Sequence, residues 1–191
     1  MEFIKKNMWK LIYGICFLSY PMIYIYNRFF KHGFNIVKGR YCASLIKYKG
    51  KNLRIVGMCT LLDTDKITIG DYCSIGEGAY FHAMGGLSIG NNVHISRNVT
   101  IYTSNHNYHS KEYIPFDNTH ILKPVTINNH VWIGRNVCIL PGVTIGEGAI
   151  IGMSAVITKD IPPLAIVVGN NHIIGYREQY RDDIKFYGKY Y

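Results

Sequence analysis

The sequence predicts an all-β solenoid of triangular cross-section, and a six-residue repeat is the first of three observations behind this prediction. An α-helix would place apolar residues on a period of about 3.6 and an isolated strand on a period of about 2, so neither explains the pattern. Eleven of the twelve first positions of the repeat are isoleucine. They are Ile69, Ile75, Phe81, Ile89, Ile95, Ile101, Ile127, Ile133, Ile139, Ile145, Ile151 and Ile157.

The fifth position of the repeat is the second observation, because it is small or β-branched in most units. Its residues are Cys73, Ala79, Gly85, Val93, Val99, Asn105, Val131, Val137, Val143, Ala149, Ala155 and Ile161. Glycine at second positions is the third observation, since glycine suits tight corners. These glycines are Gly70, Gly76, Gly90, Gly134, Gly146 and Gly152. We therefore expect each unit to form one short strand and a turn, and three units to form one coil with the first-position side chains stacked inside.

Residues 1–54 are expected to form a basic, aromatic appendage outside the solenoid. They hold eleven Lys and Arg against one acidic residue, a net charge of +10, whereas residues 55–191 carry a net charge of −1 within the total of +9. A nucleic-acid-binding protein would be expected to place its positive charge on the folded surface. Nucleic acid is therefore not an expected partner.

The appendage contains an uncharged, apolar run from Leu11 to Tyr26 with Lys and Arg on both sides. The run is shorter than the roughly 20 residues that cross a bilayer as a straight helix, and Pro21 is expected to break it in two. Such a segment favours peripheral association of residues 1–40 with an anionic membrane surface. Packing on a neighbouring subunit is the alternative, and a cleaved signal peptide is disfavoured because no clear cleavage site follows.

The solenoid is expected to span residues 55–168. A first, irregular coil covers residues 55–66, and regular coils follow. Their ranges are 69–88, 89–106, 127–144 and 145–162, with a last strand from Ala165 to Val168. Residues 107–126 break the phase and predict a loop ejected from one corner, and long loops on compact scaffolds usually carry function. Residues 169–191 form a tail that is expected to be partly helical from Tyr176 onward.

The five cysteines are scattered, with no spacing typical of zinc or of a disulfide framework. Cys59 and Cys73 fall at interior positions of the repeat, where a buried free thiol is expected. A reducing compartment is the simplest inference. We expect a cytoplasmic protein, with the appendage at the inner face of the cell membrane.

His106 is the candidate catalytic residue, because it closes a coil immediately before the ejected loop. Histidine is the side chain whose ordinary pKa lies near neutrality, which suits a general base. A histidine in a surface turn is the alternative interpretation.

The repeat, the loop after Asn105-His106 and the runs Val131–Gly134, Pro141–Gly146 and Val156–Pro162 resemble the left-handed β-helix acyltransferases. The branch with maltose, galactoside and polysaccharide O-acetyltransferases is the most similar, with the streptogramin acetyltransferases nearby. The resemblance covers about residues 55–172 and implies a left-handed parallel β-helix. It also implies acetyl-CoA as co-substrate, no metal, and a homotrimer with each active site between two chains.

By this resemblance, His106 matches the base that removes the proton of an acceptor hydroxyl. Trp132 matches the aromatic residue beside the acetyl and pantetheine arm, and Arg135 lies where a backbone N–H meets the thioester carbonyl. The positions along the coenzyme groove are Met153, Thr158 and Lys159. The positions expected near the acceptor are Asn105, His82, Glu77 and Tyr108.

Two departures from the family pattern bear on ligands. The family's Gly-Asn-Pro-Ala and following basic residue are replaced by the run Gly169-Asn170-Asn171-His172-Ile173, so the adenine end of the coenzyme is expected to bind differently. In the galactoside branch an acceptor-binding Asn lies on an early coil. The nearest matching position here is around Glu77-Gly78, which argues against a simple galactoside acceptor.

The first expectation for the acceptor is a sugar hydroxyl on a surface polysaccharide or a lipid-linked glycan precursor. A small xenobiotic, suggested by Tyr113-Ile114-Pro115-Phe116 in the loop, and an amino-sugar nitrogen are the alternatives. Two different classes stay open. A zinc enzyme resembling the γ-type carbonic anhydrases would use several of the eight histidines, and a non-enzymatic scaffold would leave the ejected loop unexplained.

Overall fold

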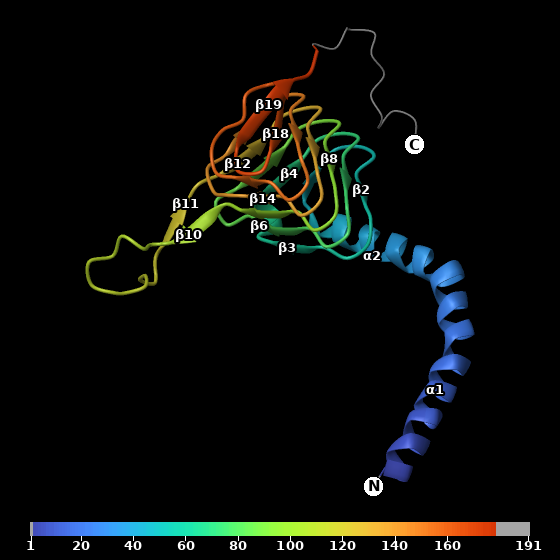
Figure 1. Cartoon of the computed structure of the whole chain (residues 1–191). Coiled ribbons are helices and arrows are strands. Elements are labelled where there is room, and N and C mark those ends of the chain that lie inside the picture. The colour runs from blue at the N-terminus through green and yellow to red at the C-terminus, as the bar shows by residue number, and fades with distance from the viewer. Residues whose placement is uncertain (1, 179–191) are drawn as a thin grey trace.

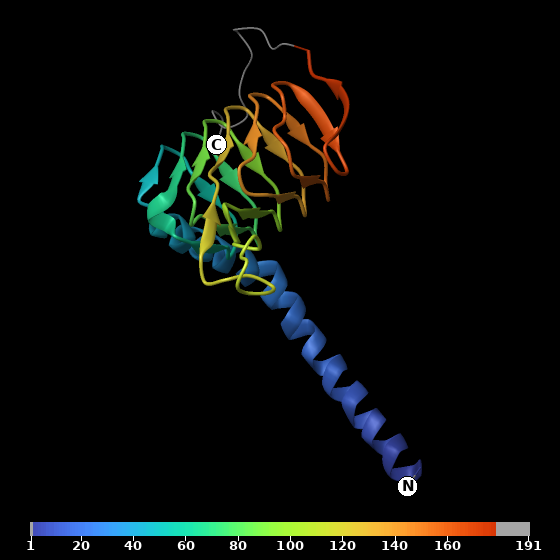
Figure 2. The same ribbon diagram turned by 90° about the vertical axis from the view of Figure 1, so that its left-hand side faces the viewer.

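The computed structural model describes residues 2–178, and its N-terminal part is one continuous helical rod (Figures 1 and 2). Helix α1 spans Glu2–Ile25, a π-helical segment η1 spans Tyr26–Phe30, and α2 spans Lys31–Leu45. Pro21 lies inside α1, so the expectation that it divides the apolar run is wrong. Proline already has the φ of a helix, and the loss of one backbone hydrogen bond does not end an otherwise continuous ladder.

The solenoid is built from three parallel sheets, one for each face of the prism. The first sheet contains β1 (Tyr48–Lys49), β4 (Ile67–Ile69), β7 (Leu87–Ile89), β12 (Val125–Ile127) and β15 (Thr144–Ile145). The second contains β2 (Arg54–Ile55), β5 (Ser74–Ile75), β8 (His94–Ile95), β13 (Trp132–Ile133), β16 (Ile150–Ile151) and β18 (Ala165–Val168), and antiparallel β19 (His172–Tyr176) covers its edge. The third contains β3 (Thr60–Leu62), β6 (Tyr80–His82), β9 (Thr100–Tyr102), β14 (Cys138–Ile139) and β17 (Val156–Ile157), and a short 3-10 helix, η2 (Thr64–Lys66), links β3 to β4.

The six-residue repeat forms the core, as the sequence predicts. All twelve first-position side chains are buried, and none is more than 4% exposed. Equivalent residues pair between successive coils, as Ile95 does with Ile75 and Ile133. Each buried isoleucine contributes on the order of 1.5–3 kcal/mol. Repetition of this contact along the axis stabilises a stack of strands of two to four residues.

The fifth positions fill the space left between the isoleucines. Ten of the twelve are buried, and the exceptions are Gly85 and Asn105. Both exceptions lie where the chain departs from the regular coil, because Gly85 lies beside Thr103 and Asn105 belongs to strand β10 of the ejected segment. Buried Cys59 and Cys73 confirm the interior thiols, and all five cysteines are free.

The ends of the solenoid differ from the expected domain boundaries. β1 pairs with β4, so the first coil begins at Tyr48, inside the segment assigned to the appendage. The last strand, β18, has the expected bounds. β19 then occupies part of the expected tail, and most of the stretch from Tyr176 to Tyr191, for which helix is expected, lies outside the described residues.

α2 closes the N-terminal end of the prism (Figure 2). Cys42 of α2 and Ile46, directly after the helix, are fully buried in the same core as the isoleucines. A Cβ added to Gly39 would lie 1.8 Å from the carbonyl oxygen of Ile55, so only glycine allows α2 to approach β2 this closely. The backbone N–H of Gly57 donates to the Asn35 carbonyl at 3.1 Å. The second half of the rod is therefore part of the folded solenoid unit.

Candidate active site

The ejected segment is an arm, residues 104–122, that projects from one corner of the prism (Figure 1). Its strands β10 (Ser104–His106) and β11 (His120–Leu122) form an antiparallel ribbon. The arm leaves after β9 of the third sheet and returns into β12 of the first sheet. The arm overlaps the predicted excursion, residues 107–126, but begins at Ser104, and Val125 and Thr126 already belong to the solenoid.

The base of the arm is fixed by a buried threonine. The Thr103 side chain is fully buried, and its hydroxyl donates to the His82 carbonyl at 3.0 Å and accepts from the Gly85 N–H at 2.7 Å. The Thr103 carbonyl accepts from the N–H of Lys123 at 2.9 Å. Both strands of the arm are thus held to the coil below.

His106 lies at the end of β10 with an exposed imidazole. Its ring stacks on Phe116 with centroids 3.9 Å apart and planes 13° from parallel, and the ring of His120 lies 4.9 Å away. An aromatic stack of this kind restricts the orientation of the imidazole while leaving its edge accessible. His106 is therefore a positioned group rather than a freely turning surface histidine.

The loop between the two strands of the arm is ordered by Asp117. Its carboxylate accepts hydrogen bonds from the Thr119 hydroxyl, the Thr119 N–H and the Asn107 amide. These donors, with Thr119 first, lower the pKa of Asp117, so it remains a carboxylate at neutral pH. Tyr108, the residue after Asn107, is exposed and packs on His109 with ring centroids 4.3 Å apart. Asn105 is also exposed, opposite Ile121.

The two remaining acceptor candidates are separated by the structure. His82 ends β6 beside the base of the arm, with Tyr102 edge-on at 5.4 Å and an Asp63 oxygen 3.8 Å from its Nε2. Glu77 lies at the other end of the third sheet, at the corner after β5, where it packs against Gly57. Only His82 is close to the arm.

Trp132, Arg135 and Met153 lie together on one part of the surface. Trp132 is 51% exposed on β13 between His94 and Ile150. Arg135 and Met153 share the corner that follows the second sheet, where the N–H of Ser154 donates to the Arg135 carbonyl at 2.7 Å. Met153 is 73% exposed, so this corner presents apolar surface beside a guanidinium.

Thr158 and Lys159 lie at the end of β17, at the far corner of the third sheet. The side chain of Asn171 forms two hydrogen bonds with Thr158. Its oxygen accepts from the Thr158 N–H at 2.9 Å, and its amide donates to the Thr158 hydroxyl at 2.6 Å. Asn171 has a φ of 54°, which proline cannot adopt. The departure from Gly-Asn-Pro-Ala thus changes the backbone as well as the side chain.

His106 and Trp132 are not brought together within the described part of the chain. The arm emerges at the corner between the third and first sheets, and Trp132 lies on the second sheet. In a triangular prism that corner is opposite the second face, and Figure 1 shows the arm and β2 with β8 on opposite sides of the solenoid. One copy of the described chain therefore presents two halves of the expected site.

The other titratable groups of the described residues are spread over the prism. Among residues 2–178, no group of three or more His, Cys, Asp or Glu is arranged to hold a metal ion. Burial lowers the pKa of His94 and of His130, and burial raises the pKa of Cys59 to about 11. These shifts favour the neutral forms of all three groups at neutral pH.

Two family sequence patterns match the chain. The pattern described as "Bacterial transferase hexapeptide (six repeats)" matches residues 117–159, and "Hexapeptide repeat of succinyl-transferase" matches residues 66–103. A hexapeptide-repeat-containing acetyltransferase from Vibrio cholerae O1 biovar eltor, solved in complex with acetyl coenzyme A, superposes with a TM-score of 0.67 at 28% identity. The match covers 73% of this chain and 77% of the solved one.

Two curated relatives carry named substrates. A chloramphenicol acetyltransferase from Agrobacterium fabrum is 34% identical over 71% of this chain and 64% of the relative. A galactoside O-acetyltransferase from Escherichia coli is 42% identical over 44% of this chain and 40% of the relative. The chain therefore spans less than two thirds of the length of either relative.

Proposed function

Because the chain belongs to the hexapeptide-repeat acetyltransferase family, we propose that it transfers an acetyl group from acetyl coenzyme A to a hydroxyl group of a sugar. The observation that carries the proposal is the stacked, solvent-accessible His106 at the base of a fixed arm. A general base must be accessible to the proton it removes and must hold its orientation. The exposure of His106 and its stacking on Phe116 support this role.

In the proposed reaction, the His106 imidazole accepts the hydroxyl proton as the acceptor oxygen attacks the thioester carbonyl. A backbone N–H near Arg135 stabilises the oxyanion. The imidazolium then returns its proton to the departing coenzyme thiolate, so no covalent enzyme intermediate is needed. Positioning of both substrates supplies much of the acceleration.

The exposed surface around Trp132 fits the coenzyme. The indole and the Met153 side chain offer apolar contact to a pantetheine arm, and Arg135 beside them is an exposed cation suited to phosphates. Lys159 is a second exposed cation, at the corner after β17. Asn171 already engages Thr158, so we expect the adenine end to depend on Lys159 more than on the Thr158 hydroxyl.

We propose that the active site forms between two copies in a homotrimer. The placement of His106 and Trp132 on opposite sides of one prism supports this arrangement, since a neighbouring copy can set the partner's Trp132 against the arm. Closed cyclic symmetry then completes every site in the same way.

A surface polysaccharide or lipid-linked glycan precursor is the proposed acceptor. Helix α1 supports this choice. Its stretch Met8–Ile25 is longer than the run from Leu11 to Tyr26 seen in the sequence, is long and apolar enough to cross a membrane, and is not buried by the rest of the described chain. We propose that α1 holds the enzyme at the inner face of the cell membrane, where such glycans are assembled. The name of the chloramphenicol-modifying relative favours a small xenobiotic hydroxyl as the second candidate.

The test is a thiol-release assay with acetyl coenzyme A and a panel of glycans, lipid-linked sugars and chloramphenicol. His106→Ala should lower the rate by about a hundredfold or more, with the oligomer unchanged in size. His109→Ala, on the same arm, is the matched control and should retain the rate. Comparable rates for His106→Ala and the wild type would remove the proposed base, and no release with any acceptor would remove acetyl transfer itself.

A further inference from the structure

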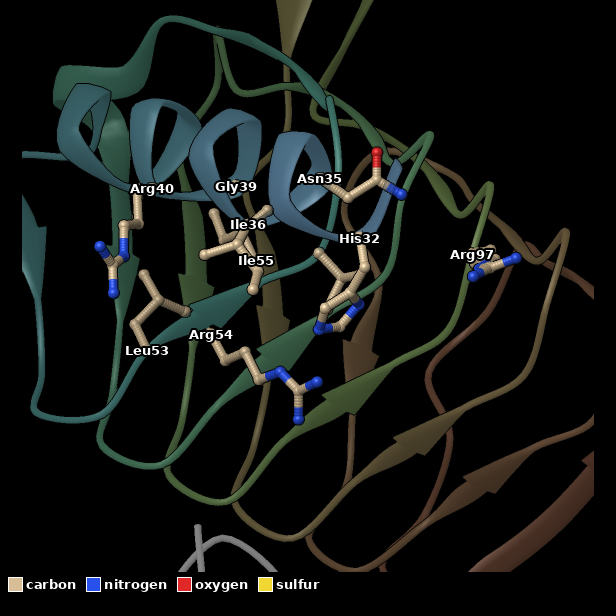
Figure 3. A pocket seen from close by; sticks show the side chains of 11 residues that line it. His32, Asn35, Ile36, Gly39, Arg40, Leu53, Arg54, Ile55 and Arg97 are labelled. Atoms are coloured by element: carbon tan, nitrogen blue, oxygen red, sulfur yellow. The ribbon is translucent and has the colours of Figure 1, made fainter. Parts of the chain in front are cut away.

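A pocket of about 460 Å³ opens where α2 meets the second sheet (Figure 3). Its polar lining consists of His32, Asn35 and Arg40 from α2, and of Arg54 and Arg97 from the solenoid. Figure 3 shows Arg54 and His32 between Arg40 at one end and Arg97 at the other. We call this site the arginine pocket.

The arginine pocket is positively charged and lacks compensating acid. No Asp or Glu is among its eleven lining residues, and within residues 2–178 the structure records no ion pair to Arg40, Arg54 or Arg97. All three guanidinium groups belong to exposed residues. Burial and, after it, the charge of Arg54 lower the pKa of nearby His94. Guanidinium groups are frequent partners of phosphate oxygens.

The pocket also has an apolar side. Ile36 and Ala43 of α2 and Leu53 before β2 complete the lining. Ile36 remains 43% exposed, so this surface is available to a ligand. A ligand that joins a phosphate to an apolar moiety would satisfy both parts of the pocket, whereas a free inorganic ion would satisfy only one.

With α1 across a bilayer, the position of the pocket along the rod is close to the outer edge of the lipid headgroups. The apolar stretch of α1 ends at Ile25, and His32 lies seven residues further along nearly continuous helix. At about 1.5 Å per residue this is about 10 Å. The polar layer on each side of a bilayer is roughly 5–8 Å thick. His32, the first residue of the pocket along the helix, would therefore lie just outside this layer, next to the headgroups.

From these observations we propose that the arginine pocket binds the phosphate group of an anionic membrane lipid, with Arg40 and Arg54 as the principal ligands and Arg97 at the rim. The inference rests on the membrane association proposed for α1 and not on acetyl transfer. A basic segment next to an apolar helix is a general means of selecting anionic lipid, and the pocket adds a defined site to it.

The test measures sedimentation of the full chain with phosphatidylcholine vesicles, with and without phosphatidylglycerol. Wild type should bind both and prefer the anionic vesicles. In the double variant Arg40→Gln/Arg54→Gln, the ratio of binding to anionic vesicles over phosphatidylcholine vesicles should fall about tenfold. The matched control is Lys38→Gln/Lys51→Gln, which removes the same charge from exposed residues outside the pocket and should lose far less.

Three results would overturn the proposal. Equal losses in the two double variants would mean diffuse attraction rather than a site. Release from anionic vesicles by millimolar inorganic phosphate, at unchanged ionic strength, would assign the pocket to free phosphate. No binding to either kind of vesicle would contradict the membrane association on which the proposal rests. Thiol release with a soluble acceptor should be the same in both variants, which separates this test from that of the proposed function.

Discussion

The solenoid and helix α1 are both rich in isoleucine, yet one buries its apolar residues and the other exposes them. In the solenoid the first-position side chain of each six-residue unit points inward and pairs with its equivalent in the next coil. In α1 apolar side chains such as Ile15, Phe17 and Leu18 are more than half exposed, and none of Met8–Ile25 is buried. A helix that is apolar on all sides requires a partner outside its own chain. Spacing, and not apolar content, decides which region is self-sufficient.

α2 lies between these two extremes. One of its faces, with Gly39 and Cys42, is buried against the first coil, while Phe34 and Val37 stay exposed. The folded unit therefore starts within the rod, and α1 is the part that can be removed without opening the prism.

The largest expected effect comes from deleting residues 1–30. The truncated chain should move completely from the membrane to the soluble fraction, while its melting temperature stays close to that of the full chain in detergent. The measurement is fractionation followed by thermal unfolding monitored by circular dichroism. Deletion of residues 1–45 is the contrasting variant: it uncovers the first coil and should lower the melting temperature. A full-length protein that is found in the soluble fraction would contradict the proposal that α1 associates with a membrane.

Truncation of a side chain should affect the free energy of unfolding far more in the solenoid core than in α1. Ile133→Ala should reduce the free energy of unfolding by about 2–5 kcal/mol, because it leaves a cavity among stacked isoleucines. Ile15→Ala, at a residue 59% exposed in α1, should change it little. Denaturant unfolding in detergent measures both. Similar losses of unfolding free energy in the two variants would show that α1 packs against the solenoid or against another copy of the chain.

The junction of α2 with the solenoid should depend on Gly39. Gly39→Ala puts a methyl group against the Ile55 carbonyl, and overpacking of this kind costs about 1–3 kcal/mol. Gly33→Ala, with open space around its added Cβ, is the control and should be neutral or slightly stabilising. Hydrogen exchange of the Gly57 amide, which donates to Asn35, would report separation of the helix.

The smallest expected effect concerns Asn171. Asn171→Gly keeps the positive φ but frees the Thr158 hydroxyl and its backbone N–H. We expect a change of a few-fold in the KM for acetyl coenzyme A, with little change in kcat, since hydrogen bonds of this kind are worth about 1 kcal/mol. Steady-state kinetics measure it. An unchanged KM would place the coenzyme away from Thr158.

Much of the architecture could be predicted because it depends on local periodicity. The twelve buried first positions, the excursion after His106 and the strand Ala165–Val168 follow from residues that repeat along the chain. The expected break at Pro21 is wrong for a local reason too, because a single proline removes one hydrogen bond while helix propensity on both sides is retained.

The sequence by itself determined a stack of isoleucine coils, a basic apolar appendage and a histidine at the start of an excursion. Only the tertiary structure decided that Phe116 stacks on that histidine, that Asn171 caps Thr158, and that three arginines distant in sequence line one pocket. It also set His106 and Trp132 on opposite sides of the prism. The physical reason is that a period of six fixes which residues point inward, whereas contacts on the outer surface depend on how corners, arm and helix pack across coils.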